Sequence, residues 1–114
     1  MTDFTGTWKN QNSSVLELTQ SGDSISGRFD SGVGDDGNTI WVEVSGRTLG
    51  DVVTFNAIYS SYKTVISWVG QLTIESGTEI IKTQWLHVSD IPDDQEQDWM
   101  WFTNRIGADV FSKI

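Results

Sequence analysis

The sequence contains no cysteine. This excludes disulfide bonds, thiolate metal ligands and cysteine nucleophiles. Basic residues are also few, since seven Lys and Arg stand against sixteen Asp and Glu, and the net charge is −9. A chain this acidic is repelled by the phosphate backbone of nucleic acids and by anionic membrane surfaces. We therefore expect neither nucleic acid nor a membrane as a partner.

Long apolar runs are absent as well. No stretch approaches the roughly 20 apolar residues that a membrane-spanning helix needs. The first residues, MTDFTG, show neither the basic nor the apolar region of a signal peptide, so no targeting segment is predicted in this chain. A length of 114 residues predicts one domain over 1–114.

Signatures of catalysis are scarce. The only histidine is His87, and no GxSxG, GxGxxG or P-loop pattern occurs. A catalytic histidine needs an orienting acid and a nucleophile, and the sequence singles out neither. The acidic run around residues 93–98 lacks the spacing and the glycine of a Ca²⁺-binding loop. We predict a protein that is not an enzyme and that has no metal site and no catalytic cofactor.

Alternation of apolar and polar residues dominates the chain and predicts strands joined by short turns. A helical turn is predicted over 95–102. About eight sequential strands favour an all-β fold, an eight-stranded antiparallel up-and-down β-barrel, with a two-sheet sandwich as the alternative. The interior of such a barrel can hold one small ligand. The predicted strands span 6–10, 15–20, 24–29, 40–46, 52–60, 64–73, 79–89 and 109–114.

Five blocks of the sequence resemble a known family. In order along the chain they read GTWKNQ, DSGVG, SWVGQL, KTQWLHVS and WFTNRIGADVFSKI. Their order and spacing, from residue 6 to residue 114, are similar to those of the avidin and streptavidin family of biotin-binding proteins. The resemblance implies a barrel that holds biotin in its open end, a homo-oligomer, and a secreted or periplasmic location.

The resemblance also implies which side chains meet the polar ureido head of biotin. Asn10 and Ser14 would donate to the ureido oxygen, while Ser31 and Asp109 would accept from its N–H groups. Phe29 stands where the family has a tyrosine that is the third donor to the oxygen. A hydrogen bond to a polarised group is worth about 1.5–3 kcal/mol, so its loss predicts weaker binding than in the tightest relatives.

The rest of the implied pocket combines an aromatic cage, a covering loop and a polar tail site. Asp35 is poorly suited to a position near the tail carboxylate because like charges repel, and Arg105 could offset it. Asn12 and His87 make the tail end more polar than is usual in the family. The cage is Phe55, Trp68 and Trp85, with Trp101 donated by a neighbouring subunit; the loop is Val33, Gly34 and Asp35; the remaining contacts are Asn12, Thr64, Ile66, His87, Ser89 and Arg105.

Two other interpretations stay open. One is a calycin-like barrel that carries a different small apolar ligand, and the other is a structural oligomer without a ligand. The polar Asn12 and His87, and Ile66 in place of the family's threonine, fit the first of these. For the assembly we expect a tetramer, although Asp51 replaces an aromatic residue common near a subunit interface.

Overall fold

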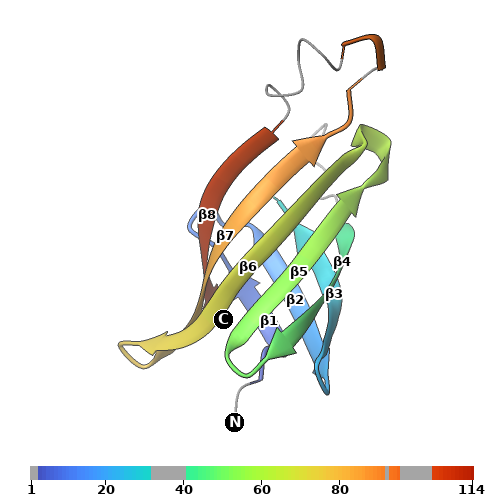
Figure 1. Cartoon of the computed structure of the whole chain (residues 1–114). Coiled ribbons are helices and arrows are strands. Elements are labelled where there is room, and N and C mark those ends of the chain that lie inside the picture. Colours follow the sequence, from blue (N-terminus) through green and yellow to red (C-terminus); the bar gives the residue numbers. More distant parts are fainter. Residues whose placement is uncertain (1–2, 32–40, 92, 96–103) are drawn as a thin grey trace.

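The structure is a computed structural model that describes residues 3–31, 41–91, 93–95 and 104–114. Eight antiparallel strands follow one another around a closed barrel (Figure 1). This confirms the predicted eight-stranded up-and-down barrel and excludes the sandwich. The strands are β1 (Gly6–Lys9), β2 (Val15–Ser21), β3 (Ser24–Asp30), β4 (Trp41–Leu49), β5 (Val52–Tyr59), β6 (Thr64–Glu75), β7 (Thr78–Ser89) and β8 (Asn104–Lys113).

The barrel closes where the first strand meets the last. Trp8 pairs with Lys113 and Lys9 with Ser112, which joins β1 to β8. The longest ladder joins β6 to β7 and runs from Thr64↔Ser89 to Glu75↔Thr78. The hairpin of β6 and β7 extends past its neighbours at the end of the barrel that holds both termini (Figure 1).

Some strand boundaries differ from the predicted ones. The last strand begins at Asn104 rather than at residue 109, because residues 104–108 continue the ladder with β7 through pairs such as Val88↔Asn104. A short 3-10 turn, η2 (Ser60–Tyr62), links β5 to β6. A second, η3 (Asp93–Gln95), overlaps the predicted helical turn at Gln95, and residues 96–102 of that prediction lie outside the described residues.

The core fills the half of the barrel that holds the termini. Inward-facing side chains alternate with outward-facing ones, as the pleat of a strand requires. Trp8 is fully buried, and its Nε1 donates to the carbonyl oxygen of Phe4 at 3.0 Å. No helix among the described residues is long and apolar enough to cross a membrane. The fully buried side chains include Phe4, Trp8, Leu16, Phe55, Ile81 and Phe111.

Candidate functional site

The opposite end of the barrel, here called the mouth, carries the predicted ligand residues. It is formed by the turn at residues 10–14, by η2, and by the mouth-facing ends of β3, β7 and β8. Strand alternation directs the predicted side chains on β3 and β5–β8 to the inner face. Four predicted contacts, Val33, Gly34, Asp35 and Trp101, lie outside the described residues.

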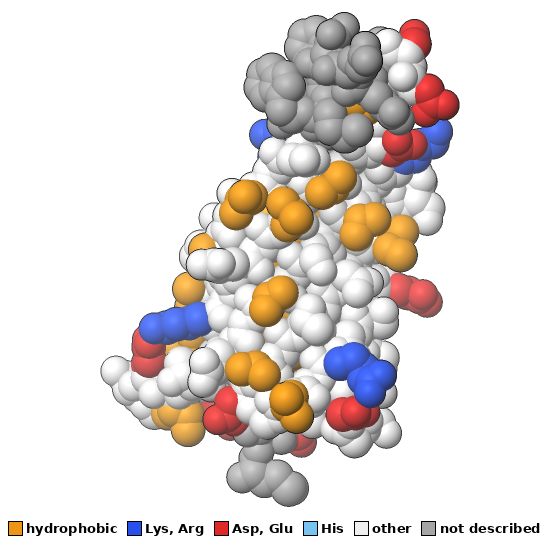
Figure 2. All heavy atoms as spheres, viewed as in Figure 1, with side chains coloured by type: hydrophobic (Ala, Val, Ile, Leu, Met, Phe, Trp, Pro, Cys, Tyr) orange, Lys and Arg blue, Asp and Glu red, His pale blue; other side chains and the backbone are white. Residues whose placement is uncertain are grey.

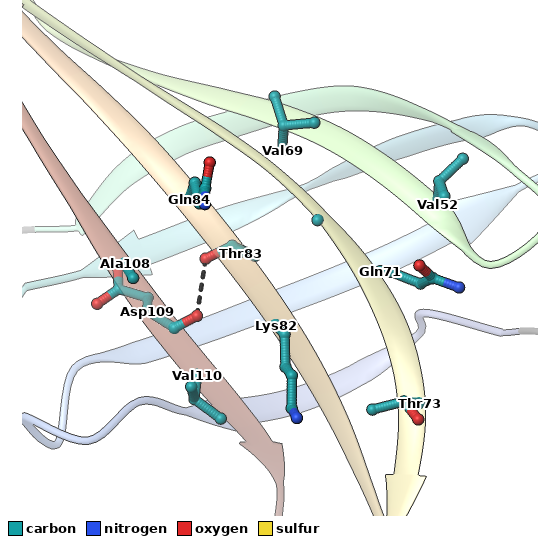
Figure 3. A pocket seen from close by; sticks show the side chains of 11 residues that line it. Val52, Val69, Gln71, Thr73, Lys82, Thr83, Gln84, Ala108, Asp109 and Val110 are labelled. Atoms are coloured by element: carbon teal, nitrogen blue, oxygen red, sulfur yellow. Dashed lines mark hydrogen bonds between the residues drawn. The ribbon is translucent and has the colours of Figure 1, made fainter.

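The carboxylate of Asp109 accepts hydrogen bonds from three side chains at the mouth. The carboxylate is almost fully buried, and its Oδ2 accepts from Trp68 Nε1 at 2.9 Å. Its Oδ1 accepts from Asn10 Nδ2 at 3.2 Å and from Gln11 Nε2 at 2.9 Å. On the backbone side, Thr83 Oγ1 donates to the Asp109 carbonyl oxygen at 2.9 Å (Figure 3). Bonds from three other elements therefore hold this acceptor at one position inside the barrel.

Gln11 is a site residue that the sequence did not reveal. Besides its bond to Asp109, its Oε1 accepts from the Val110 backbone N–H at 2.9 Å. The side chain thus ties the turn at residues 10–14 to β8. A polar residue in a turn carries no pattern of its own, and the only signal was its position between Asn10 and Asn12.

Asn10 shapes the turn that carries Ser14. Its Oδ1 accepts from the backbone N–H of Asn12 and of Ser14, each at 2.9 Å. An amide side chain has two N–H donors, and in the part of the chain that the structure describes Asn10 gives one of them to Asp109. Ser14 is buried, and its Oγ donates to the Ser31 carbonyl oxygen at 2.8 Å. The turn therefore brings the amide, the hydroxyl and the end of β3 together.

An aromatic layer forms the floor beneath these polar groups. Phe55 stacks on Trp68 with 5.1 Å between ring centroids, and Phe29 packs against Trp68 at the same centroid distance. All three side chains are buried. Trp85 is half-buried one strand away, and the bare backbone of Gly107 makes room for its indole, because a Cβ there would lie 2.2 Å from the ring.

Tyr59 is a second residue that the sequence did not reveal. It follows the inward-facing Phe55 and Ala57 on β5, so it shares their face and lies nearer the mouth. The side chain is half-buried, and its hydroxyl hydrogen-bonds with Ser31. Burial raises the pKa of the Tyr59 phenol, and the charge of Asp30 acts in the same direction. The alternation of β5 is the signal in the sequence that places Tyr59 on the inner face.

The predicted tail contacts gather at the edge of the mouth. Thr64 is buried, and its Oγ1 lies 2.7 Å from Ser89 Oγ and donates to the Tyr62 carbonyl oxygen at 3.1 Å. His87 pairs across the sheet with Ile66 on one side and with the exposed Arg105 on the other. In the described part of the chain, His87 Nδ1 is the one buried side-chain polar atom without a hydrogen-bond partner.

The unpaired nitrogen of His87 is expected to lower the free energy of unfolding of the ligand-free protein. Replacing such a group by an apolar one of similar size is neutral or stabilising, so His87→Leu should raise the free energy of unfolding by up to about 1 kcal/mol. His87→Asn, which keeps a polar atom, should show no such gain. Urea unfolding without ligand measures both variants. If the free energy of unfolding of His87→Leu falls by more than about 1 kcal/mol, His87 Nδ1 has a hydrogen-bond partner in the protein and the prediction is wrong.

A separate hollow lies on the outside of the barrel. It has a volume of about 720 Å³ and crosses β5 to β8, with outward-facing side chains such as Val52, Val69 and Gln84 along it (Figure 3). The sheet separates it from the mouth, and it contains none of the predicted ligand side chains except Asp109, whose carboxylate bonds to groups at the mouth. The hollow is therefore a feature of the outer surface.

Solved structures of other proteins share this barrel. Xenavidin matches with a TM-score of 0.83 at 21% identity, with 97% of each chain covered. A biotin-binding protein from chicken gives 0.82 at 20% identity over 96% of this chain and 94% of that one. Apo shwanavidin gives 0.76 at 21% identity over 97% and 100%. At these identities the likeness shows the fold.

Comparison at the level of sequence gives the family. Curated protein sequences yield no significant match. The profile of the avidin family, in contrast, matches residues 1–114. The match includes all five blocks and all eight strands of the barrel. The chain belongs to the avidin family.

Proposed function

We propose that the protein binds biotin in the mouth of the barrel and catalyses no reaction. The observation that carries the proposal is the fixed carboxylate of Asp109, held next to the Asn10 amide by a 3.2 Å hydrogen bond. The chicken relative of the same fold is named as a biotin-binding protein. The donors and acceptors at this mouth match the requirements of a cyclic urea.

The ureido oxygen needs donors, and its two N–H groups need acceptors, because an unpaired buried polar group costs roughly 2–7 kcal/mol. Asn10 Nδ2 and Ser14 Oγ would donate to the oxygen, and Ser14 would give up its present bond to the Ser31 carbonyl. A carboxylate offers about four lone-pair sites. Among the described residues, Trp68, Asn10 and Gln11 occupy three of these sites on Asp109, and the fourth would take a ureido N–H. Ser31 would accept from the other N–H.

The apolar ring of biotin would rest on the aromatic floor, and its tail would point outward. Trp68 and Trp85 offer aromatic surface to the thioether ring, supported from below by Phe55. The hydroxyls of Thr64 and Ser89, already 2.7 Å apart, would meet the tail carboxylate. The proposal keeps the other contacts implied by the sequence, which are Asn12, Phe29, Val33, Gly34, Asp35, Ile66, His87, Trp101 and Arg105.

Phe29 sets the proposed affinity below that of the tightest relatives. Its ring is buried against Trp68, and it carries no hydroxyl for the ureido oxygen. One hydrogen bond to a polarised group is worth about 1.5–3 kcal/mol, or roughly one to two decades in the dissociation constant.

Isothermal titration with biotin tests the function. We expect one biotin bound per chain, with a negative heat-capacity change because apolar surface is buried. An apolar fluorescent dye serves as the second probe, and biotin should displace it from the mouth. Dye binding that biotin leaves unchanged, with no heat on biotin addition, would favour a barrel for a different apolar ligand. No binding of either probe would favour the structural oligomer.

We also propose that the protein is a homo-oligomer, with a tetramer favoured and Trp101 reaching the site of a neighbouring subunit. Apolar side chains gather on the outside of the barrel, on the side shown in Figure 2. Isolated exposed apolar residues are ordinary, but here several of them lie near one another on one side of the barrel, as is typical of an interaction surface. The outer apolar face consists of Val52, Val65, Val69, Leu86, Val88, Ile106 and Val110, all at least 38% exposed.

A charge within the outer apolar face should break the assembly. Leu86 pairs with Ser67 on β6 and with Ile106 on β8, so Leu86→Lys places an ammonium group inside the patch. Light scattering should show about four chains for the wild type and a smaller particle for the variant. Thr19→Lys, on the exposed side of β2, is the control and should keep the wild-type mass. A Leu86→Lys protein with unchanged mass would contradict this interface.

A further inference from the structure

Two hydroxyl side chains meet at the mouth where the family's tyrosine hydroxyl is missing. Tyr59 reaches in from the end of β5 and hydrogen-bonds with Ser31, which follows the end of β3. Phe29 lies two residues before Ser31, on the same inner face. The phenol of Tyr59 therefore lies beside the residues proposed to hold the ureido group.

From this placement we propose that Tyr59 supplies a third donor to the ureido oxygen, which offsets part of the loss caused by the missing hydroxyl of Phe29. The inference rests on the proposed function, since it names a further residue of the same biotin site. In this arrangement Tyr59 is a ligand-contacting residue that helps to select the urea group.

The numbers of hydrogen-bond donors and acceptors on the two hydroxyls support this role. A hydroxyl donates one hydrogen bond and accepts two. When the Ser31 hydroxyl donates to Tyr59, a lone pair of Ser31 remains for a ureido N–H, and the Tyr59 proton is directed to the ligand. A urea presents its carbonyl oxygen next to an N–H group. The pair of hydroxyls therefore offers a donor and an acceptor side by side, which matches the two adjacent groups of the urea.

The surroundings of Tyr59 keep its proton in place. Burial is the largest influence and raises the pKa of the phenol, and the negative charge of Asp30 raises it further, while the bond to Ser31 opposes both. The phenol is thus neutral, and able to donate, at every pH below its ordinary range near 10. Thr64, its partner across the ladder, carries no charge.

The direct test is biotin titration of Tyr59→Phe, which keeps the ring and removes the hydroxyl. One hydrogen bond is worth about 0.5–1.5 kcal/mol net, so the dissociation constant should rise roughly 2- to 13-fold. Tyr62→Phe is the matched control, because Tyr62 is the only other tyrosine, is 55% exposed, and contacts Thr64 through its backbone carbonyl oxygen, which the substitution keeps. Tyr62→Phe should bind as the wild type does, and a wild-type dissociation constant in Tyr59→Phe would overturn the proposal.

Two further arms locate the contact. Desthiobiotin keeps the cyclic urea and lacks the sulfur, so the loss in Tyr59→Phe should be the same for desthiobiotin as for biotin. A loss confined to biotin would place the phenol against the sulfur and overturn the proposal. Phe29→Tyr should restore binding in the Tyr59→Phe background by a larger factor than it improves the wild type. Equal gains in the two backgrounds would show that the two hydroxyls act independently, against the proposal.

A spectroscopic measurement covers the case in which Tyr59→Phe folds poorly. In Tyr62→Phe the only remaining phenol is Tyr59. Its ionisation, followed by ultraviolet absorbance, should move to higher pH when biotin binds, because the ligand holds the protonated donor. An ionisation unmoved by saturating biotin would overturn the role of Tyr59 and leave biotin binding intact. A wild type that does not bind biotin would overturn the proposed function itself.

Discussion

Asp109→Ala is expected to weaken biotin binding roughly 30- to 4,000-fold. Removing one partner from a buried, hydrogen-bonded charged group costs about 2–5 kcal/mol, and each 1.4 kcal/mol is a factor of ten. The loss has two sources in this structure. A ureido N–H would lose its acceptor, and the donors on Trp68, Asn10 and Gln11 would lose theirs. Isothermal titration of the purified variant measures the change.

Two variants separate the charge of Asp109 from a general effect of removing an acid. Asp109→Asn keeps the size of the side chain but replaces one acceptor oxygen by an NH₂ donor. Its affinity for biotin should therefore lie between those of the wild type and Asp109→Ala. Asp23→Asn removes the negative charge of a side chain that is 63% exposed and paired with Arg47 on the outside of the barrel. This control should bind biotin normally. Wild-type affinity in Asp109→Ala would refute the role given to the carboxylate.

Trp68→Ala should lower the free energy of unfolding by about 3–5 kcal/mol, the usual loss for truncating a buried tryptophan. The Trp68 indole stacks on Phe55, packs against Phe29 and donates a hydrogen bond to Asp109. Trp68→Ala therefore removes the two ring contacts and the hydrogen bond together. Against a typical stability of about 5–15 kcal/mol, such a loss leaves a marginal protein. Urea unfolding followed by circular dichroism gives the value.

Two further variants, Trp68→Phe and Trp41→Ala, separate the contribution of the hydrogen bond from that of losing a tryptophan ring. Trp68→Phe keeps an aromatic ring in the floor and loses the donor to Asp109, which should cost about 1.5–3 kcal/mol. Trp41 lies in β4 with the Arg28 guanidinium carbon 3.9 Å from its ring centroid, an exposed cation–π contact worth about 0.5–1 kcal/mol. Trp41→Ala should therefore cost the least. Equal losses in Trp68→Ala and Trp41→Ala would show that Trp68 has no special place in the floor.

The barrel was largely predictable because alternation is a local property of the sequence. Each strand shows one apolar and one polar face over a few residues, and the turns between them are short. The start of the last strand was not predictable in this way. Residues 104–108 read NRIGA, which does not alternate cleanly, and only pairing with β7 makes them a strand.

The site was predictable only where family motifs marked it. The structure brings Asn10, Ser14 and Asp109 together at the mouth, and their role in binding stays a prediction. The sequence did not show that Asp109 accepts a hydrogen bond from the indole N–H of Trp68. These residues are 41 positions apart, and the register of β6, β7 and β8 brings them together. Gln11 was missed because nothing in a turn distinguishes a structural polar side chain from a solvated one.

Tyr59 was missed for a different reason. The strand period places it on the inner face with Phe55 and Ala57, but no family motif marks this position. The bond to Ser31 depends on β3 and β5 approaching each other at the mouth across β4, which no local pattern encodes.

A crystal structure of the protein grown with saturating biotin tests the binding site most directly. We predict the ureido oxygen within hydrogen-bond distance of Asn10 Nδ2 and Ser14 Oγ, with the ureido N–H groups directed at Ser31 and Asp109. Biotin bound instead in the outer hollow beside Val69 and Gln84, or a mouth without ligand at saturation, would contradict the proposed site.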